Sequence, residues 1–349
     1  MNDRSMKRGR IVPLLLTAGG LAIIGAATVK PAAPALDATL QAAIAASSTI
    51  SYTGIVQVTR IGNRSSEAAV YRIEHRAPDL TRRVYTAPSS LAGDSVVTNG
   101  QLCFSIDARR HRIIETRNDA AGDSMALNAN FALLRENYRV VRRGEEMFDG
   151  RRTVDLMLVN KRTGRTAMMV RLDRSSNLVL EKKEFAPNGA LVSELRFDEI
   201  RFTRAIPPAD FALPKQYTLV RGPIFGAASE NLDRVVHDAG FGAVVPRSLP
   251  DGFSAVEGNV VAFRGIPTVH LLYCDGIRTL SLFENAKPSA LELAHFEPKT
   301  LVVAGRTAQY AEDGATALLT WNDGTLYYTL VGQLGLAELQ RIADQIRKP

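Results

Sequence analysis

Residues 151–202 read RRTVDLMLVNKRTGRTAMMVRLDRSSNLVLEKKEFAPNGALVSELRFDEIRF, and this stretch carries the strongest structural signal in the chain. Four runs rich in apolar and β-branched residues predict strands at 152–160, 166–173, 179–185 and 191–202. Polar turns separate them at Thr163-Gly164, Ser175-Ser176-Asn177 and Asn188-Gly189. Connections this short join antiparallel neighbours, so the stretch predicts an antiparallel sheet.

The same pattern extends toward the N-terminus. Strand-like runs begin at Tyr52 and at Val70 and continue at 83–86, 95–98, 101–106, 112–116 and 138–143. Asn99-Gly100 joins two of these runs, and Asn-Gly is the strongest two-residue hairpin signal. Apolar residues at helical spacing predict two helices, at 36–46 and 125–138. The first domain is therefore expected to hold about ten antiparallel strands and one or two helices.

A second domain is expected after Ile206-Pro207-Pro208. Its predicted strands lie at 256–264, 268–274, 279–284, 300–309, 316–322 and 326–331, and a closing helix lies at 336–346. The expected fold class is thus α+β and mostly antiparallel β. The expected boundaries are a targeting segment at 1–35, a first domain at 36–205, a linker at 206–224 and a second domain at 225–349.

The N-terminal segment predicts export. Lys7, Arg8 and Arg10 precede an apolar run from Ile11 to Val29, which is the pattern of a secretory signal. Small residues near Ala26 and Ala33 offer cleavage sites. Since about 20 apolar residues can span a bilayer, an uncleaved inner-membrane anchor is the alternative. Both interpretations place the rest of the chain in the periplasm.

Composition narrows the partners. Hydrophobic residues make up 46% and charged residues 23% of the 349 residues, which indicates a globular protein. The net charge of +7 suits lipid, lipopolysaccharide or an acidic protein surface. Arginine is spread along strand-like segments rather than gathered on one helix, so nucleic acid is not expected. Cys103 and Cys274 form a disulfide or stay as buried thiols; sequence separation does not decide between these.

No catalytic or cofactor motif is present in the sequence. Nucleophile-elbow, phosphate-loop, HExxH, CxxC and dinucleotide fingerprints are absent, and no two histidines have ligand spacing. We therefore expect no enzyme activity, no cofactor and no metal site. The unusual chemical feature is a set of arginine clusters in the first domain. Arg82, Arg83, Arg142, Arg143, Arg151 and Arg152 are candidates for contact with an anionic lipid or an acidic peptide, or else simply protect exposed strands from aggregation.

Several short motifs occur along both predicted domains. In the first domain these are Ser51-Tyr52-Thr53-Gly54, Asn137-Tyr138, Gly150-Arg151-Arg152-Thr153-Val154, Val170-Arg171-Leu172-Asp173 with Asn177-Leu178-Val179-Leu180, Asn188-Gly189 and Phe197. In the second domain they are Leu249-Pro250-Asp251-Gly252-Phe253, Leu272-Tyr273-Cys274-Asp275-Gly276, Leu280-Ser281-Leu282-Phe283 and Gln340-Arg341-Ile342-Ala343-Asp344. Together these motifs resemble the MucB/RseB family of periplasmic regulators of the envelope-stress sigma factor.

The resemblance implies a fold and a function. The first domain would be a LolA-like open half-barrel with covering helices, and the second a smaller β-sheet with a helix. The protein would bind the periplasmic domain of a membrane anti-sigma factor and sense lipid or mislocalised lipoprotein. Large apolar residues would line the concave face that accepts acyl chains: Ile55, Val70, Phe104, Ile113, Leu156, Met168, Val170 and Leu195. An ordinary closed core would contain the same residues.

Two other functions remain open at this point. One is a lipid or lipoprotein carrier without a sigma-pathway partner, and the other is a cell-envelope hydrolase with an unrecognised site. The chain has two departures from the family pattern, namely a long apolar N-terminal segment and a cysteine in each domain.

Overall fold

The computed structural model describes residues 33–62, 66–100, 102–117, 125, 130–221, 228–263, 265–287, 298–313 and 316–346. The expected signal or anchor, Met1 to Val29, lies outside these residues. Among the helices that are described, none has the length and apolar character needed to cross a bilayer.

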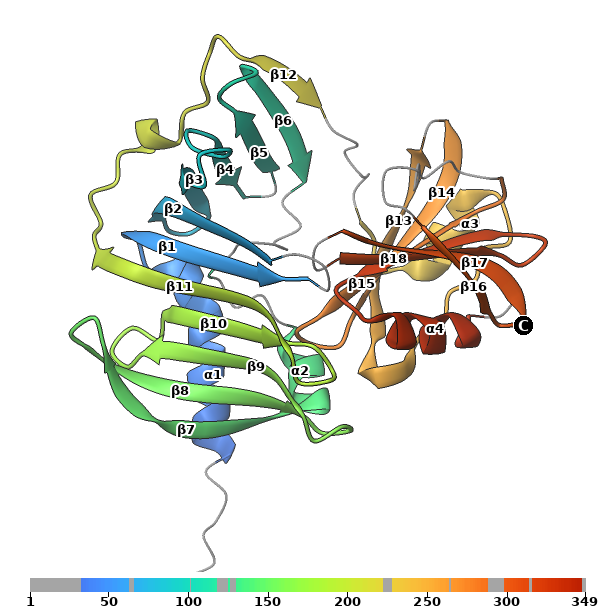
Figure 1. Ribbon diagram of the computed structural model, residues 1–349, viewed down its shortest axis with the longest axis horizontal. Coiled ribbons are helices and arrows are strands. Elements are labelled where there is room, and N and C mark those ends of the chain that lie inside the picture. Colours follow the sequence, from blue (N-terminus) through green and yellow to red (C-terminus); the bar gives the residue numbers. More distant parts are fainter. Residues whose placement is uncertain are drawn as a thin grey trace, which may run out of the picture. The chain divides into compact units, whose positions relative to one another are not determined.

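A large sheet forms the first half of the described chain. Its strands are β1 Tyr52–Ile61, β2 Ser66–Arg76, β3 Leu80–Ala87, β4 Ser95–Asn99, β5 Leu102–Asp107, β6 Arg112–Arg117, β7 Tyr138–Phe148, β8 Arg151–Asn160, β9 Thr166–Asp173, β10 Val179–Phe185, β11 Leu191–Phe202 and β12 Thr218–Arg221. In the described residues they follow the order β12-β6-β5-β4-β3-β2-β1-β11-β10-β9-β8-β7 (Figure 1). Neighbours are antiparallel, except that β12 runs parallel to β6.

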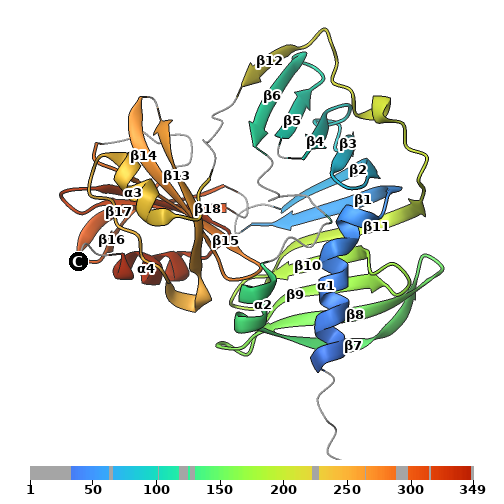
Figure 2. The ribbon, with the colours of Figure 1, turned by 180° about the vertical axis from the view of Figure 1, so that it is seen from behind.

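Two helices pack on one face of this sheet. Helix α1 (Ala33–Thr49) crosses the strands from β1 through β11 to β7, and the short helix α2 (Phe131–Asn137) lies on the same face (Figure 2). Leu40 and Ala43 of α1 are almost fully buried in a cluster with Val56 and Leu156. We call the face that carries Val56, Tyr71 and Leu156 the inner face, and the opposite one the outer face.

A second, smaller sheet follows. Its described elements are α3 Leu232–Ala239, η2 Pro250–Gly252, β13 Ser254–Phe263, β14 Ile266–Cys274, β15 Thr279–Asn285, β16 Lys299–Val303, β17 Arg306–Asp313, β18 Thr316–Asn322, β19 Tyr327–Gly332 and α4 Leu336–Gln345. The strand order in the described residues is β13-β14-β15-β19-β18-β17-β16. Leu232 and Val235 of α3 and Leu339 and Ile342 of α4 fill a separate core on one face of this sheet.

The predicted fold class is confirmed. The chain is mostly antiparallel β, with a large open sheet covered by helices and a smaller sheet closed by a helix. Strands β9, β10, β11 and β18 have the predicted bounds.

Four predicted features differ from the structure. The helix expected at 125–138 is described only as α2, because Tyr138 already begins β7. The strand expected at 300–309 is a hairpin of β16 and β17 that turns at Ala304 and Gly305, both with positive φ. Helix α3 was not expected. The segment expected as a linker contains the 3-10 helix η1 (Pro208–Phe211) and β12, which pairs with β6. The domain boundaries themselves stay a prediction.

Both cysteines of the described chain are free thiols. Cys103 is half-buried in β5, whereas Cys274 is buried at the end of β14, where its sulfur accepts a hydrogen bond from the backbone N–H of Gly276 at 3.2 Å. Of the two alternatives for these cysteines, the structure therefore contains the free thiols and not the disulfide.

Candidate functional site

The inner face of the first sheet has a covered part and an open part. Strands β7 to β11 and β1 lie under α1, and their inward residues form the core of this half of the chain (Figure 2). The end of β2 that carries Tyr71 and Ile73 also packs in this core, and His75 of β2 contacts α1. The inward residues that line the cavity, at the other end of β2 and on β3 to β6, lie beyond α1. This open part is where a concave surface is available to a ligand.

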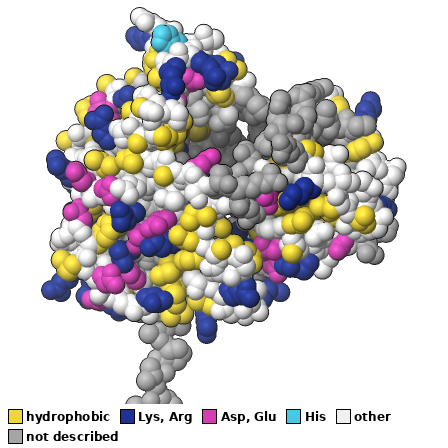
Figure 3. Space-filling model, viewed as in Figure 1, with side chains coloured by type: hydrophobic (Ala, Val, Ile, Leu, Met, Phe, Trp, Pro, Cys, Tyr) yellow, Lys and Arg dark blue, Asp and Glu magenta, His cyan; other side chains and the backbone are white. Residues whose placement is uncertain are grey.

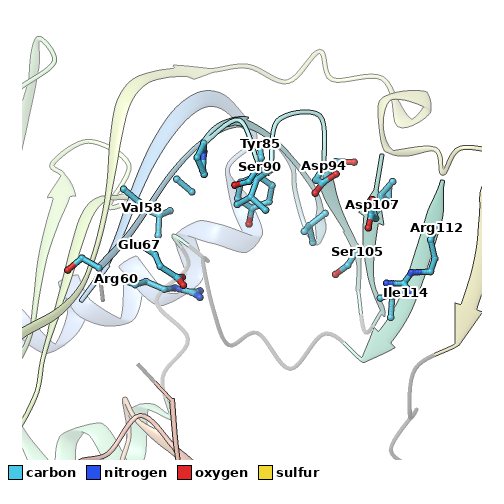
Figure 4. A pocket seen from close by; sticks show the side chains of 18 residues that line it. Val58, Arg60, Glu67, Tyr85, Ser90, Asp94, Ser105, Asp107, Arg112 and Ile114 are labelled. Atoms are coloured by element: carbon cyan, nitrogen blue, oxygen red, sulfur yellow. The ribbon is translucent and has the colours of Figure 1, made fainter. Parts of the chain in front are cut away.

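A cavity of about 790 Å³ occupies the open part (Figure 4). Strands β1 to β6 and the connection between β3 and β4 supply its lining. Ligand pockets in proteins commonly have volumes of about 300–1,000 Å³, so this cavity has the size of a binding site.

The apolar part of the lining follows from strand register. Val58 pairs with Ala69 across β1 and β2, and Val96 pairs with Ser105, which in turn pairs with Ile114. Paired residues point to the same face, so these side chains line up across neighbouring strands. Tyr85 lies over the same surface (Figure 4). The result is an apolar floor that runs across the strands.

Charged residues surround this floor (Figure 4). Asp94 accepts a hydrogen bond from the backbone N–H of Ala108 at 2.9 Å. Asp107 accepts one from the backbone N–H of Arg110 at 2.8 Å, which lowers the pKa of the Asp107 carboxyl and keeps it ionised. Both acids are thus used by the loops that they cap. By contrast, Nε of Arg112 is buried and has no hydrogen-bond partner among the described residues.

The residues that the sequence predicts for the concave face fall into two groups. Leu156, Met168, Val170 and Leu195 do lie on the inner face, but they are buried in the core beneath α1. They fill the covered part, and the cavity lies beyond them. These four residues therefore belong to an ordinary closed core, which was the alternative to a ligand-binding face.

The other four predicted residues lie on the outer face. Phe104 and Ile113 pack there against Ile206 and Phe211, in the segment that follows β11. Ile55 and Val70 are half-buried; they neighbour Val56 and Tyr71, which point inward, and so face outward. Alternation gives two sets of residues for each strand, and the covering segments decide which set faces inward.

The six candidate arginines do not form one surface. Arg82 donates to the backbone oxygen of Asp210 at 2.9 Å on the outer face. Its neighbour Arg83 lies over the ring of Tyr71, 5.9 Å from its centre, on the inner face. In the sheet, β2, β1, β11, β10 and β9 separate these two residues from the other four.

The remaining arginines lie on β7 and β8. Arg142 forms an ion pair with Glu145, and Arg143 donates to the sulfur of Met157 at 3.5 Å. Arg151 forms an ion pair with the buried Asp173 at 3.3 Å and stacks over Phe202, while Arg152 is exposed. Because β7 is the edge of the sheet, these charges fit the protection of an exposed strand.

The outer face carries a charged network that the sequence did not reveal. Arg171 binds Asp155 through two nitrogens, each at 2.8 Å, and also pairs with Glu146 at 2.9 Å and Glu181 at 3.1 Å. The hydrogen bonds from Arg171 to Asp155 raise the pKa of this guanidinium above its usual value. Figure 3 shows acidic and basic side chains gathered together on this face.

A second network joins the two sheet regions, and we call it the junction. It comprises Asn137, Tyr138, Asp275, Arg278 and Glu338. The Asp275 carboxylate, which is fully buried, accepts hydrogen bonds from the hydroxyl of Tyr138 at 2.6 Å and from Nε of Arg278 at 2.8 Å. Arg278 also pairs with Glu338 at 3.1 Å. Asn137 donates to the backbone oxygens of Gly252 at 3.0 Å and Asp275 at 2.9 Å.

Tyr138 and Arg278 of the junction both keep their protons at neutral pH. Burial, and then the neighbouring carboxylate of Asp275, raise the pKa of the Tyr138 hydroxyl, which therefore stays protonated and donates. Burial is the largest single effect on Arg278 and lowers its pKa, but Asp275, Tyr138 and Glu338 together outweigh it, so the net shift is upward. Each buried charge in the junction thus has a partner of opposite sign.

Three of the motifs singled out in the sequence meet at the junction, whereas Arg278 and Glu338 belong to none of them. Asn137-Tyr138, the Pro250-Asp251-Gly252 turn and Asp275-Gly276 are all pieces of the family resemblance. They lie 115 and 138 positions apart, so no local pattern predicts that they meet.

Two family models match separate parts of the chain. A family model described as the MucB/RseB N-terminal domain matches residues 36–215, and a domain of unknown function, DUF4367, matches residues 243–346. No curated protein matches the chain.

Solved structures similar to the whole described chain include MucB. The complex of Pseudomonas aeruginosa MucA and MucB is 18% identical, covers 88% of this chain and 97% of that chain, and superposes with a TM-score of 0.59. MucB in complex with the periplasmic part of MucA is 19% identical, with 88% and 97% covered and a TM-score of 0.58. MucB alone is 18% identical, with 90% and 98% covered and a TM-score of 0.56. At these identities the likeness shows a shared fold.

The family model spans just over half of the chain and includes every residue that lines the cavity. The chain therefore belongs to the MucB/RseB family.

Proposed function

We propose that this protein is a periplasmic regulator that binds the periplasmic domain of a membrane anti-sigma factor and releases it when lipid or mislocalised lipoprotein is bound. Membership of the MucB/RseB family is the observation that carries the proposal. The shared fold with MucB, which has been solved in complex with periplasmic MucA, supports it. Family membership also makes the protein a regulatory binding protein and not an enzyme, which sets the hydrolase alternative aside.

The inner-face cavity is the proposed lipid site. Val58, Val96 and Ile114 give it an apolar floor, which suits a hydrocarbon chain. The buried Nε of Arg112 suits an acceptor oxygen on a polar head group, because a bound acceptor would satisfy a donor that otherwise has no partner among the described residues. An amphiphile satisfies both requirements.

The proposed location is the periplasm, either as a free protein after cleavage near Ala26 or Ala33 or as a protein tethered by the uncleaved segment. Mass spectrometry of the chain purified from bacterial envelopes distinguishes these forms. A mature chain that lacks its first 25–35 residues, counted by the small-residue cleavage pattern, indicates a free protein. The full-length mass indicates a tether.

Partner binding is tested by calorimetric titration. The periplasmic domain of the anti-sigma factor encoded beside this gene is titrated into the purified chain. We expect saturable binding in the micromolar range or tighter, about −8 kcal/mol or better. Heat signals equal to those of dilution would contradict the proposed regulatory function.

Lipid binding is tested on protein purified from envelopes by native mass spectrometry. We expect bound species of lipid mass in the wild type and a large loss of them in Val96→Trp, which fills the cavity from its floor. Val302→Trp is the matched control, since Val302 is 67% exposed on β16 of the second sheet. Equal lipid occupancy in both variants would rule out this cavity as the site.

The runner-up function is a lipid or lipoprotein carrier without a sigma-pathway partner. The same cavity favours it, and it predicts the lipid result without the calorimetric one. The two experiments together therefore separate a regulator from a carrier.

The six arginines remain proposed contacts for an anionic partner. Arg142, Arg143 and Arg152 are exposed on β7 and β8 and are the members that a partner reaches most easily. Contact through them would weaken as salt is added, because exposed charges are screened.

A further inference from the structure

Helix α2 contacts the inner-face core at one end. Leu134 is fully buried and Phe131 is half-buried in the cluster that also holds Leu40 of α1. Ile277, from the turn between β14 and β15, packs against the same cluster. Residues of the second sheet region thus meet the first core at α2.

The other end of α2 is bound into the junction. Asn137 is its last residue and donates to the Gly252 and Asp275 backbone oxygens, and Tyr138, directly after the helix, donates to the Asp275 carboxylate. The two bonds to Asp275 are buried and the bond to Gly252 is partly buried. Breaking either buried bond leaves a polar group without a partner in a place that water does not reach.

The two turns that receive α2 fit closely against it. A Cβ atom on Gly276 would lie 2.4 Å from the backbone nitrogen of Leu134, and one on Gly252 would lie 2.2 Å from Oδ1 of Asn137. Both glycines also have positive φ, at 110° and 90°. The turns therefore match one position of α2, and a displaced helix would lose their hydrogen bonds together.

We propose that α2 couples occupancy of the inner face to the second sheet region through the junction. This rests on the proposed function, in which an amphiphile binds the inner face and the anti-sigma domain is released. Val58 and Tyr85 line the cavity and also pack in the cluster that holds Phe131 and Leu134. A ligand that displaces this cluster would pull Asn137 and Tyr138 out of register with Asp275. Packed, hydrogen-bonded contacts have discrete arrangements, so a small shift in the core becomes a change of state in the second sheet region.

The test is a coupling measurement with one hydroxyl removed. Tyr138→Phe keeps the buried ring and deletes the hydrogen bond to Asp275. The affinity of the labelled anti-sigma periplasmic domain is measured by fluorescence anisotropy, with and without saturating lysophosphatidylglycerol as the amphiphile. We expect the factor by which the lysolipid weakens domain binding to fall by about threefold to tenfold in the variant, while lysolipid binding alone stays close to that of the wild type.

The matched control is Tyr273→Phe. Tyr273 is also a fully buried tyrosine, and its hydroxyl donates to the backbone oxygen of Pro246 at 2.9 Å, within the second sheet region. We expect this variant to couple as the wild type does. Asn137→Ala, which deletes the other two bonds, should reproduce the Tyr138→Phe result.

The outcomes separate the two ideas. Wild-type coupling in folded Tyr138→Phe and Asn137→Ala proteins would overturn the role of α2 and leave the proposed function standing. A wild type that binds neither the domain nor the lysolipid would overturn the proposed function, and this inference with it.

Discussion

Glu284 is a fully buried carboxyl in the core of the second sheet. One oxygen accepts a hydrogen bond from the backbone N–H of Val244 at 2.8 Å, and the other has no partner among the described residues. Burial raises the pKa of Glu284 from 4.5 to about 8, so the side chain is protonated at neutral pH. Its pKa is higher folded than unfolded, so stability is fully present below about pH 4.5 and is lost as pH rises through about 8.

We therefore expect Glu284→Gln to stabilise the second sheet region at alkaline pH. At pH 8.5 the gain should be on the order of 3 kcal/mol, and at pH 4.5 it should be close to zero. Trp321, the single tryptophan of the chain, stacks on Tyr328 in the same core, so its fluorescence reports this unfolding directly. Urea curves of both proteins at the two pH values make the measurement. A gain that is the same at both would contradict the assignment.

His75 fastens α1 to the first sheet. Its Nε2 lies 2.5 Å from the backbone oxygen of Ser47, and its Nδ1 lies 2.8 Å from the hydroxyl of Thr81. The neutral ring donates to Ser47 and accepts from Thr81, so protonation removes one bond. Burial lowers the pKa of His75, in spite of the bond to Ser47. The stability due to the neutral ring is therefore present above the unfolded pKa, about 6.5, and is lost as pH falls below it.

Acidification should consequently loosen α1. We expect amide hydrogen exchange at the C-terminal end of α1 to accelerate between pH 7 and pH 5, after correction for intrinsic exchange, by about tenfold. His75→Gln, which cannot titrate, should lack this pH dependence. Exchange that accelerates equally in both proteins would place the effect elsewhere.

At the scale of the elements, Arg171 links its own strand, β9, to three other strands on the outer face. It is 18% exposed and holds Asp155 on β8, Glu146 on β7 and Glu181 on β10. Arg171→Met keeps an unbranched side chain but leaves three acids close together. We expect a loss of about 2–3 kcal/mol, since the removed partner of a partly buried ion pair leaves unpaired charge behind.

Arg174→Met provides the comparison for Arg171. Arg174 is 54% exposed and pairs with Glu145 at 2.7 Å, so its loss should cost at most about 0.5 kcal/mol. Thermal unfolding monitored by circular dichroism in the β region measures both variants. Equal shifts would mean that the Arg171 network contributes no more than a surface pair.

Strands were predicted correctly where a polar turn lies at each end of the apolar run. Asp173 ends β9 because its carboxylate accepts hydrogen bonds from the backbone N–H groups of Ser175 and Ser176. An aspartate followed closely by two serines indicates such a turn from the sequence alone. The hairpin of β16 and β17 was missed because its turn, Ala304-Gly305, follows an apolar run. The turn contains no Asn, Asp or Ser beside the glycine to indicate it.

The candidate site was harder to predict than the strands. Phe104 and Ile113 alternate correctly with their neighbours, but the segment that follows β11 covers the face on which they lie. That segment is distant in sequence, so the inner and outer sets of these strands are assigned only by tertiary packing. Val58, Val96 and Ile114 alternate in the same way and instead face the cavity.

At the scale of the whole molecule, the described chain brings together an amphiphile-sized cavity, a core beneath α1 and a buried junction to a second sheet. The family resemblance of the short motifs implied an open sheet with a concave face and a second, smaller sheet, but neither it nor periodicity predicted the junction. Three of those motifs meet there, because Asn137 donates to one backbone oxygen in each of the two turns.

The most direct test measures the affinity of the wild-type chain for the periplasmic domain of its anti-sigma factor, with and without saturating lysophosphatidylglycerol. We expect tight binding without lipid and an affinity at least about tenfold weaker with it, since a ligand acts only through a difference in its affinity for the two states. The same affinity under both conditions would contradict release of the anti-sigma domain by lipid.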